Sequence, residues 1–347
     1  MAENRDTKVT PQEALLELAT RKARNNLACF TLYTFPKFKM GWFHREVCRE
    51  LDEFLADVVA GKSPRLILTA PPRHGKSQLV SREFPAYLLG RYPDMSVIAC
   101  SYSSDLSTRM NRDVQRIMDS PAYHRLFDSY LAGREAVAAT GDNGAYERTT
   151  KLLEIVGHQG SYRSAGVGNG ITGTGCDILI VDDPFKDRKE AYSETVRDSV
   201  YGWYTSTAST RLSPGGGIIV MCTRWHQSDL VGRLLSQPSE TPDGLPCRPW
   251  KLINYPAIAE HDEKYRREGE ALHPDRYPLA DLREKQATMP PSEWAALYQQ
   301  RPIPAGGGVF KEDWINYYTT PPAEFDKIVL SWDMTFKDSD GSDYVVG

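Results

Sequence analysis

One short stretch of the sequence has residue types and spacing suited to phosphate chemistry. The segment RLILTAPPRHGKSQLV, residues 65–80, joins an apolar run to a loop that ends in Gly75, Lys76 and Ser77. This layout matches the phosphate-binding pattern G-x-x-x-x-G-K-[ST], except that Ala70 stands at the first glycine position. The apolar strand before the loop and the helix-compatible stretch after it are the context that the pattern requires. We therefore predict nucleotide binding here, against the alternative of a chance match to the common tripeptide GKS.

The residues of this loop are expected to hold a triphosphate in different ways. Pro71 and Pro72 have no N–H group, so the phosphate-binding amides are expected from the residues that follow. These are Arg73, His74, Gly75, Lys76 and Ser77. Lys76 is expected to pair with the outer phosphates, and the Ser77 hydroxyl to bind Mg²⁺. Arg73 places an additional cation within reach of the phosphates.

Two adjacent carboxylates follow a second apolar run. In the segment CDILIVDDPF, residues 176–185, four apolar residues lead into Asp182 and Asp183. A P-loop ATPase needs one carboxylate at the end of a neighbouring strand to hold Mg²⁺ and another group to orient water. We predict the first role for Asp182 and the second for Asp183, where most motor ATPases have Glu. The alternative interpretation is a strand followed by an ordinary acidic turn.

A third apolar run ends in polar residues. The segment GIIVMCTRWHQSDL, residues 217–230, predicts a strand beside the acidic one, followed by a polar start to a helix. Thr223 or Arg224 is placed to sense the γ-phosphate at the end of this strand. A strand followed by a capped helix is the alternative. His226 has no neighbouring partner for a metal site, so we interpret it as structural.

The hydrophobic pattern predicts an α/β fold with a mainly parallel sheet, because short apolar runs alternate with helical stretches. The expected strands are 65–69, 96–100, 152–156, 177–181 and 217–222. The expected helices are 11–28, 43–60, 77–90, 104–119, 190–211 and 228–236. In the first helix we expect Leu15, Leu16, Leu18 and Leu27 to form the apolar face.

Composition shifts divide the sequence into five expected parts. They are an N-terminal helical region (1–61), a P-loop ATPase core (62–236), a helical lid or linker subdomain (237–301), a linker (302–310) and the beginning of another domain (311–347). Within the core, the glycine-rich stretch 160–175 is expected to be either a mobile loop that touches a polymer or nucleotide, or a plain connection. The arginines 109, 112 and 116 share one helix face, which is either a DNA-contacting or a solvated basic face.

Composition and charge limit the class of protein. The 347 residues carry a formal net charge of −4, so any contact with nucleic acid must come from a local basic surface or from assembly. The six cysteines form no C-x-x-C pair and are expected to be reduced and mostly buried, as in a cytosolic protein. We find no apolar stretch of the roughly 18 residues that a membrane span needs, and no signal-peptide core at the N-terminus.

With these motifs in order, the chain resembles the large terminase subunit of tailed double-stranded-DNA bacteriophages. The resemblance runs across most of the chain. Its matching stretches are MGWFHREV (40–47), APPRHGKS (70–77), SYSSDLSTRMNRDV (101–114), LIVDDPFKDR (179–188), MCTRWHQSDL (221–230) and YQQRPIP (298–304). The combination of PPRHGKS, VDDP and TRWH is specific to this family.

The resemblance implies an ATP- and Mg²⁺-dependent motor that pumps double-stranded DNA into a procapsid. It implies a homo-oligomeric ring on the portal protein, a small terminase subunit as partner, and the cytoplasm of the infected host as the place of action. It assigns the phosphate role to Lys76, Mg²⁺ to Ser77 and Asp182, catalysis to Asp183 and coupling to Thr223. Arg73 matches an arginine that stabilises transition-state charge from within the subunit. Trp42 and His44 match an adenine-contacting segment.

The family also carries an RNase H-like nuclease domain that uses two divalent metal ions, Mg²⁺ or Mn²⁺. The segment KIVLSWDMTFKDSDGSDYVVG, residues 327–347, resembles the first strand and turn of that domain, with Asp333 as its first metal carboxylate. A two-metal site needs further carboxylates from later strands, and none follows in this sequence. We therefore expect a truncated nuclease domain that does not cut DNA, with poor packing of the last roughly 40 residues because an incomplete sheet leaves an unpaired edge.

Two other functions are compatible with the motifs. One is a helicase-like DNA-remodelling ATPase that has no capsid partner. The other is a non-catalytic P-loop scaffold in which the nucleotide only stabilises an oligomer. The complete set of Lys76, Ser77, Asp182 and Asp183 disfavours the scaffold, and the linker followed by the strand with Asp333 disfavours the helicase-like enzyme.

Overall fold

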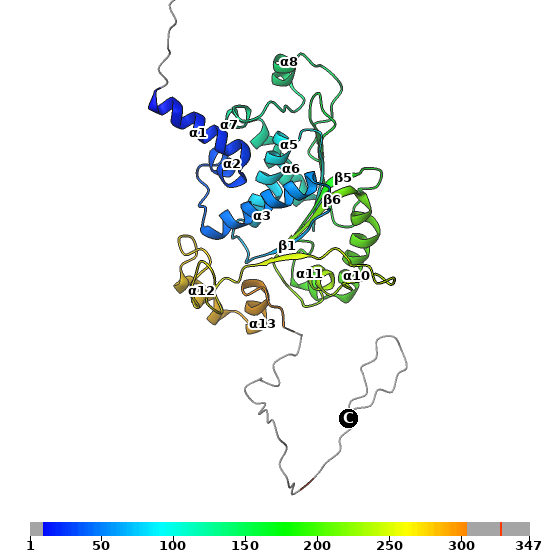
Figure 1. The fold of residues 1–347 in the computed structure, drawn as a ribbon. Helices are drawn as coiled ribbons and strands as arrows, with labels where there is room; N and C mark the ends of the chain where they lie inside the picture. Colours follow the sequence, from blue (N-terminus) through cyan, green and yellow to red (C-terminus); the bar gives the residue numbers. More distant parts are fainter. Residues whose placement is uncertain (1–9, 304–326, 328–347) are drawn as a thin grey trace, which may run out of the picture. The chain divides into compact units, whose positions relative to one another are not determined.

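The protein, seen in a computed structural model that describes residues 10–303 and 327, is built around a seven-stranded sheet (Figure 1). The strands are β1 (Arg65–Thr69), β2 (Ser96–Ser101), β3 (Leu152–Glu154), β4 (Ser161–Gly166), β5 (Cys176–Asp182), β6 (Leu212–Cys222) and β7 (Lys251–Asn254). Their order in the sheet is β3-β4-β2-β5-β6-β1-β7. All neighbours are parallel except the antiparallel pair β3 and β4. The predicted α/β fold with a mainly parallel sheet is confirmed.

Helices cover this sheet and connect its strands. The longer ones are α1 (Pro11–Asn25), α2 (Leu27–Thr34), α3 (Trp42–Val59), α5 (Phe84–Arg91), α6 (Ser104–Met118), α8 (Arg134–Thr140), α10 (Glu194–Trp203) and α12 (Leu279–Thr288). The shorter ones are α4 (Lys76–Gln78), α7 (Pro121–His124), α9 (Arg188–Tyr192), α11 (Leu230–Leu235) and α13 (Pro291–Glu293). π-Helical turns lie at Leu79–Glu83, Tyr204–Ala208 and Trp294–Tyr298, and a 3₁₀ turn at Ser209–Arg211. The turn Leu79–Glu83 joins α4 to α5, the turns Tyr204–Ala208 and Ser209–Arg211 continue α10, and the turn Trp294–Tyr298 continues α13.

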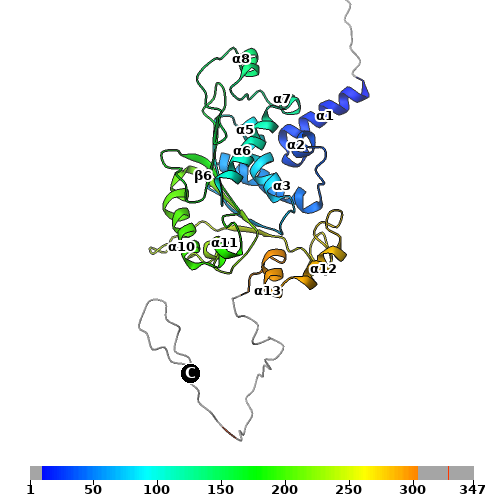
Figure 2. The same cartoon turned by 180° about the vertical axis from the view of Figure 1, so that it is seen from behind.

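The central strands are buried on both faces, as their continuous apolar sequences predict. On β5, Ile178 and Ile180 face one hydrophobic cluster, whereas Leu179 and Val181 face another. The first cluster lies under α2, α3, α5 and α6, and the second under α9, α10 and α11 (Figures 1 and 2). This division into two faces follows from the two-residue period of a strand. The sheet is therefore the middle layer of three.

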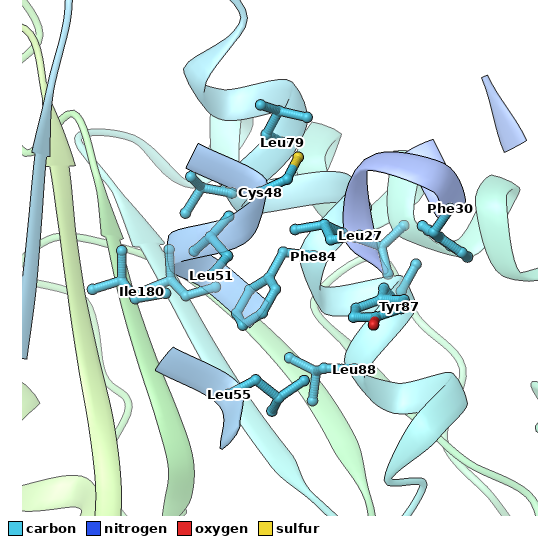
Figure 3. Close-up of a cluster of buried hydrophobic side chains, with 14 of the residues drawn as sticks. Leu27, Phe30, Cys48, Leu51, Leu55, Leu79, Phe84, Tyr87, Leu88 and Ile180 are labelled. Atoms are coloured by element: carbon cyan, nitrogen blue, oxygen red, sulfur yellow. The ribbon is translucent and has the colours of Figure 1, made fainter. Parts of the chain in front are cut away.

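One cluster fixes the helix that follows the phosphate loop. Leu51 and Leu55 of α3 pack with Phe84 and Leu88 of α5, close to Ile180 of β5 (Figure 3). Each of these side chains is at most 1% exposed. Burying a side chain of this size contributes about 1.5–3 kcal/mol. The phosphate loop is thus held between a central strand and a helix with a well-packed inner face.

The predicted helix over 11–28 is interrupted. Asn26 has φ −147° and ψ 121° and caps α2 by accepting the Cys29 N–H at 2.9 Å, so α1 ends and a new helix begins. The expected apolar face is also wrong: Leu15, Leu16 and Leu18 are 67%, 55% and 48% exposed, and only Leu27 is buried. A helical period alone does not tell whether anything packs against the stripe. The helix predicted over 43–60 is confirmed as α3.

Two strands were not anticipated. The glycine-rich stretch 160–175, expected to be a loop, begins with β4, which pairs with β2 and β3 inside the sheet. β7 comes from the stretch 237–301, expected to be helical, and pairs with β1. Both have weak apolar patterns. The buried positions of β4 include the small residues Ser164 and Gly166, and β7 is an edge strand with Lys251 and Asn254 at its ends. The sheet therefore extends beyond residue 236, where the sequence predicts the end of the ATPase core.

Replacing Glu83 with glutamine should change how stability depends on pH. Glu83 is fully buried in the π-helical turn, and its two carboxylate oxygens accept hydrogen bonds from Gln78 at 2.8 Å and Thr34 at 3.0 Å. Burial raises the pKa of Glu83 from 4.5 to about 7. Between these two pH values the folded protein holds a proton that the unfolded chain has released, so the free energy of unfolding falls as the pH rises.

Glutamine carries no charge at any pH; its amide oxygen can accept from Gln78, and its amide N–H can donate to the Thr34 hydroxyl. The stability of Glu83→Gln relative to the wild type should therefore increase by about 2 kcal/mol between pH 5 and pH 8. Urea unfolding at several pH values measures this difference. Glu135→Gln, at an exposed glutamate, serves as the matched control. A Glu83→Gln curve parallel to that of the control would contradict the raised pKa.

Candidate active site

The predicted functional residues meet where three strands end. In the sheet, β6 lies between β1 and β5, with Cα partners Thr69 and Cys222 on one side and Asp182 and Met221 on the other. The third strand, β6, therefore lies beside the acidic strand β5, as predicted, and it separates β5 from the phosphate-loop strand β1. Because all three strands are parallel, their carboxyl ends still share one edge of the sheet, and the loops that follow them face each other.

A cavity of about 720 Å³ opens at this edge. Of the predicted site residues, Arg73, Gly75, Lys76, Ser77, Asp183 and Thr223 line it. Its size falls within the range of roughly 300–1,000 Å³ that is usual for small-molecule sites. The phosphate loop, the acidic strand and the third strand thus contribute to a single site.

Gly75 is the residue at which the loop turns into the helix. It has φ +85°, a left-handed conformation that glycine adopts without strain, and it caps α4. A Cβ atom at this position would lie 2.8 Å from Nε2 of His44. The turn therefore requires glycine both for its backbone angle and for the close approach of His44.

Lys76 points back across the loop. Its ammonium group donates to the carbonyl oxygens of Ala70 at 2.6 Å and Pro71 at 3.0 Å, and to Thr223 Oγ1 at 2.8 Å. The side chain is buried, and this burial lowers its pKa, an effect that the nearby Asp183 carboxylate partly opposes. Its three acceptors include no carboxylate. The cation is thus held at the cavity by neutral groups.

Asp182 is buried and is held by two serines of the phosphate-loop helix. Its Oδ1 accepts from Ser77 Oγ at 3.2 Å and its Oδ2 from Ser81 Oγ at 2.7 Å. Burial raises the pKa of Asp182, and the neighbouring Asp183 raises it further, while the two serine hydrogen bonds act in the opposite direction. Ser77 and Asp182 thus place two hard oxygen ligands side by side, which suits Mg²⁺.

Asp183 adopts an unusual backbone conformation. Its φ is +46°, and its Oδ1 accepts the N–H of Thr223 at 2.9 Å, while its own N–H donates to Met221 O at 2.8 Å. Left-handed φ values at non-glycine residues carry strain and are frequent at active sites. Asp and Asn tolerate this region better than other residues do. The backbone thus turns the carboxylate of Asp183 toward the end of β6 and the cavity.

Thr223 connects the lysine and the carboxylate. Its hydroxyl accepts from Lys76 and lies 3.3 Å from Ala70 O, and its N–H donates to Asp183. Arg224, the other candidate sensor, instead donates from Nε to both carboxylate oxygens of the buried Asp229, at 3.0 and 2.9 Å. Asp229 also caps α11. The structure thus brings Thr223 to the cavity and turns Arg224 away into a structural ion pair.

Arg73 and His74 lie at the outer side of the loop. Arg73 has φ +61°, its side chain is exposed at the cavity, and its carbonyl oxygen accepts the hydroxyl of Tyr277 at 3.2 Å. The ring of the same Tyr277 stacks on His74 with 4.5 Å between centroids. His74 is buried, and this burial lowers its pKa to about 4, so it is neutral at pH 7. Its ring supports the loop and does not line the cavity.

Trp42 and His44 do not line the cavity either. The N–H of Gly41 donates to Nδ1 of His44, so Nε2 carries the proton and donates to the carbonyl oxygen of His74 at 2.9 Å. Burial lowers the pKa of His44 to about 3. Trp42 packs against Tyr255, with 5.8 Å between ring centroids. Of the predicted adenine-contacting pair, His44 therefore supports the phosphate loop, whereas Trp42 packs beside the end of β7.

Several cavity residues were missed from the sequence. Phe35 and Phe38, from the loop between α2 and α3, supply aromatic lining where Trp42 and His44 were expected. Their only local signal is a pair of aromatic residues between two helical stretches. Among the other missed residues, Tyr102, Lys186 and Arg276 come from loops far apart in sequence.

The charge of the cavity suits an anionic ligand. Among the described residues, its lining has four cationic side chains, Arg73, Lys76, Lys186 and Arg276, and a single carboxylate, that of Asp183. We find no group of three or more His, Cys, Asp or Glu side chains able to hold a metal within 10–303. Mg²⁺ usually binds through one or two carboxylates together with substrate phosphates.

The remaining predicted residues lie elsewhere. Arg109, Arg112 and Arg116 are exposed on α6, and Arg116 forms an ion pair with Asp113 at 2.8 Å. Asp333 lies outside the described residues. All six cysteines are free, and four of them are buried. None of the helices within the described part of the chain has the length and apolar character that a membrane crossing demands.

Comparison with known proteins identifies the family. The family model for the terminase large subunit, T4likevirus-type, N-terminal, matches residues 67–317, which is more than half of the chain. The chain belongs to the terminase large subunit family. No curated protein matches it.

Solved terminase structures are similar to this chain at low identity. The large terminase of bacteriophage HK97 is 14% identical with a TM-score of 0.47, over 77% of this chain and 52% of that one. The ATPase domain of the large terminase from Thermus phage P74-26 is 12% identical with a TM-score of 0.44, over 72% of this chain and 96% of that one. The large terminase of the thermophilic bacteriophage D6E in complex with ADP is 10% identical with a TM-score of 0.38, over 71% of this chain and 52% of that one. The chain thus spans about half the length of the HK97 and D6E large terminases.

Proposed function

We propose that this terminase large subunit hydrolyses ATP to translocate viral double-stranded DNA into a procapsid. The observation that carries the ATPase proposal is that hydrogen bonds join Lys76, Thr223 and Asp183 at one cavity, although each follows a different strand. Family membership supports the DNA-packaging part of the proposal. The mainly cationic lining supports a triphosphate as the ligand.

The proposed roles follow from the contacts of each side chain. Lys76 holds the outer phosphates, exchanging the carbonyl oxygens of Ala70 and Pro71 for phosphate oxygens. Asp183 accepts the proton of the attacking water, and the Thr223 N–H keeps its carboxylate in place. Ser77 and Asp182 hold Mg²⁺, which would neutralise charge that develops on the phosphates. The aromatic side chains of Phe35 and Phe38 are available for the base.

The assembly belongs to the same proposal. We expect a homo-oligomeric ring on the portal protein of the procapsid, in the cytoplasm of the infected host, working with a small terminase subunit. Measuring ATP hydrolysis by the purified chain, alone, with DNA and with capsid–portal complexes, tests the proposal. Stimulation by DNA alone, with no response to capsid–portal complexes, would favour a helicase-like remodelling enzyme instead.

The Lys76→Ala variant should lose nucleotide binding. The change removes the buried cation at the phosphate loop, and the surrounding carbonyl groups cannot replace its charge. In the wild type, ATP at 100 times its Kd should stabilise the folded state by about 2.7 kcal/mol, because only the folded chain binds it. Thermal unfolding with and without Mg²⁺–ATP should show this stabilisation in the wild type and in the exposed-lysine control Lys189→Ala. Equal stabilisation of Lys76→Ala would refute nucleotide binding at this loop.

A further inference from the structure

Two adjacent glutamines, Gln299 and Gln300, are buried just after the last described helical turn and have no part in the proposed chemistry. They belong to the segment YQQRPIP, which carries none of the predicted site residues. The side chain of Gln299 accepts the N–H of Ile258 at 3.1 Å and donates to the carbonyl oxygen of the same residue at 2.9 Å. Gln299 thus holds the backbone around residue 299 against the backbone at Ile258.

Gln300 bonds in another direction. Its Oε1 accepts the N–H of Arg224 at 3.1 Å, and its side-chain amide donates to the carbonyl oxygen of Leu297. Gln300 has φ +58° and is only 4% exposed. A long side chain in this backbone region is strained, and such a conformation persists only where its surroundings enforce it. The strained backbone of Gln300 thus directs its side chain to the end of β6.

The end of β6 needs acceptors from outside the sheet. Its register with β1 ends at Cys222, so the next two N–H groups, those of Thr223 and Arg224, are beyond the ladder. Buried N–H groups almost always find a partner. The N–H of Thr223 donates to Asp183 and that of Arg224 to Gln300. Two side-chain oxygens, from Asp183 and from the much later Gln300, therefore fix consecutive peptide units.

We propose that Gln300 is a positioning residue of the ATPase site, a role that rests on the proposed function. By holding the Thr223–Arg224 peptide, it sets the place of the Thr223 hydroxyl beside Lys76 and of the Thr223 N–H on Asp183. Leu297, which accepts from Gln300, also lines the cavity. Gln300 lies immediately before the stretch 302–310. A change in its position would therefore displace the Thr223–Arg224 peptide at the site.

Matched substitutions of the two glutamines test this role. Methionine fills nearly the same space but does not accept the hydrogen bond as a carbonyl does. Gln300→Met should lower kcat for ATP hydrolysis ~10-fold or more, because small misplacements of catalytic groups cost up to ~100-fold in rate. Its KM and its thermal stabilisation by Mg²⁺–ATP should stay within about twofold of the wild type, since it leaves the phosphate loop intact. Gln299→Met should lower the unfolding temperature but keep kcat within about twofold.

Gln300→Gly keeps the inference testable if the methionine variant does not fold. Glycine accepts φ +58° without strain, so this change removes the side chain alone. Normal kcat in Gln300→Met or Gln300→Gly, or an equal loss of kcat in Gln299→Met, would overturn the positioning role. A wild-type chain that shows no ATP turnover dependent on Lys76 would instead overturn the proposed function, and the role of Gln300 with it.

Discussion

Replacing Arg73 with alanine should lower kcat for ATP hydrolysis by ~10³-fold or more and change KM for ATP much less. The exposed guanidinium lines the cavity two residues before Gly75, and within the described residues no carboxylate forms an ion pair with it. It is therefore available to the phosphates. An arginine acting on charge that develops only in the transition state affects kcat and leaves substrate binding nearly unchanged.

The backbone at Arg73 determines which controls are informative. Because φ is +61°, alanine keeps the strain while it removes the guanidinium, whereas Arg73→Gly removes both. Equal losses of kcat in the two variants would assign the effect to the side chain. Arg73→Lys keeps a positive charge without the planar fork of donors and should recover only part of the rate. A rise in KM with unchanged kcat would show that Arg73 merely holds ATP, or that a neighbouring subunit supplies the catalytic arginine.

The parts of the site that the sequence predicts are those encoded by contiguous residues. The phosphate loop from Arg73 to Ser77 and the pair Asp182–Asp183 each follow an apolar strand, so strand end and functional side chain are specified together. Parallel strands then bring these ends to one edge of the sheet, whatever the strand order. This is why the positions of Lys76 and Asp183 at the cavity follow from local patterns, even though β6 separates β1 from β5.

The parts that the sequence does not predict depend on contacts between distant residues. In a sequence, an aromatic residue near a histidine is compatible with two roles, contact with the nucleotide base or support of the phosphate loop. Only the packing of α3 against the loop shows that His44 lies behind Gly75. Leu15 shows the reverse problem, since a helical apolar stripe does not specify a partner. Gln300 lies 76 residues from Arg224, and no local sequence pattern predicts the hydrogen bond between them.

The backbone also explains the residue type at the predicted catalytic position. Most motor ATPases have Glu where this chain has Asp183, which from the sequence alone weakens the assignment. In the structure this residue has φ +46°, a region that the short Asp and Asn side chains tolerate and longer ones disfavour. The turn after β5 therefore suits Asp. Asp183→Glu should accordingly not behave as a neutral exchange of one carboxylate for another.

Asp183→Asn should depress kcat by ~10²-fold or more and leave nucleotide binding near normal. Asparagine tolerates the left-handed backbone, and its amide oxygen can still accept the Thr223 N–H, now bonded at 2.9 Å. The substitution therefore removes the negative charge and the basic oxygen without releasing the end of β6. Single-turnover hydrolysis gives the rate, and thermal stabilisation by Mg²⁺–ATP reports binding in the same preparation. If Asp183→Asn hydrolyses ATP at the wild-type rate, the water must be activated by another group, and the hydrogen bond to Thr223 would remain as a structural contact only.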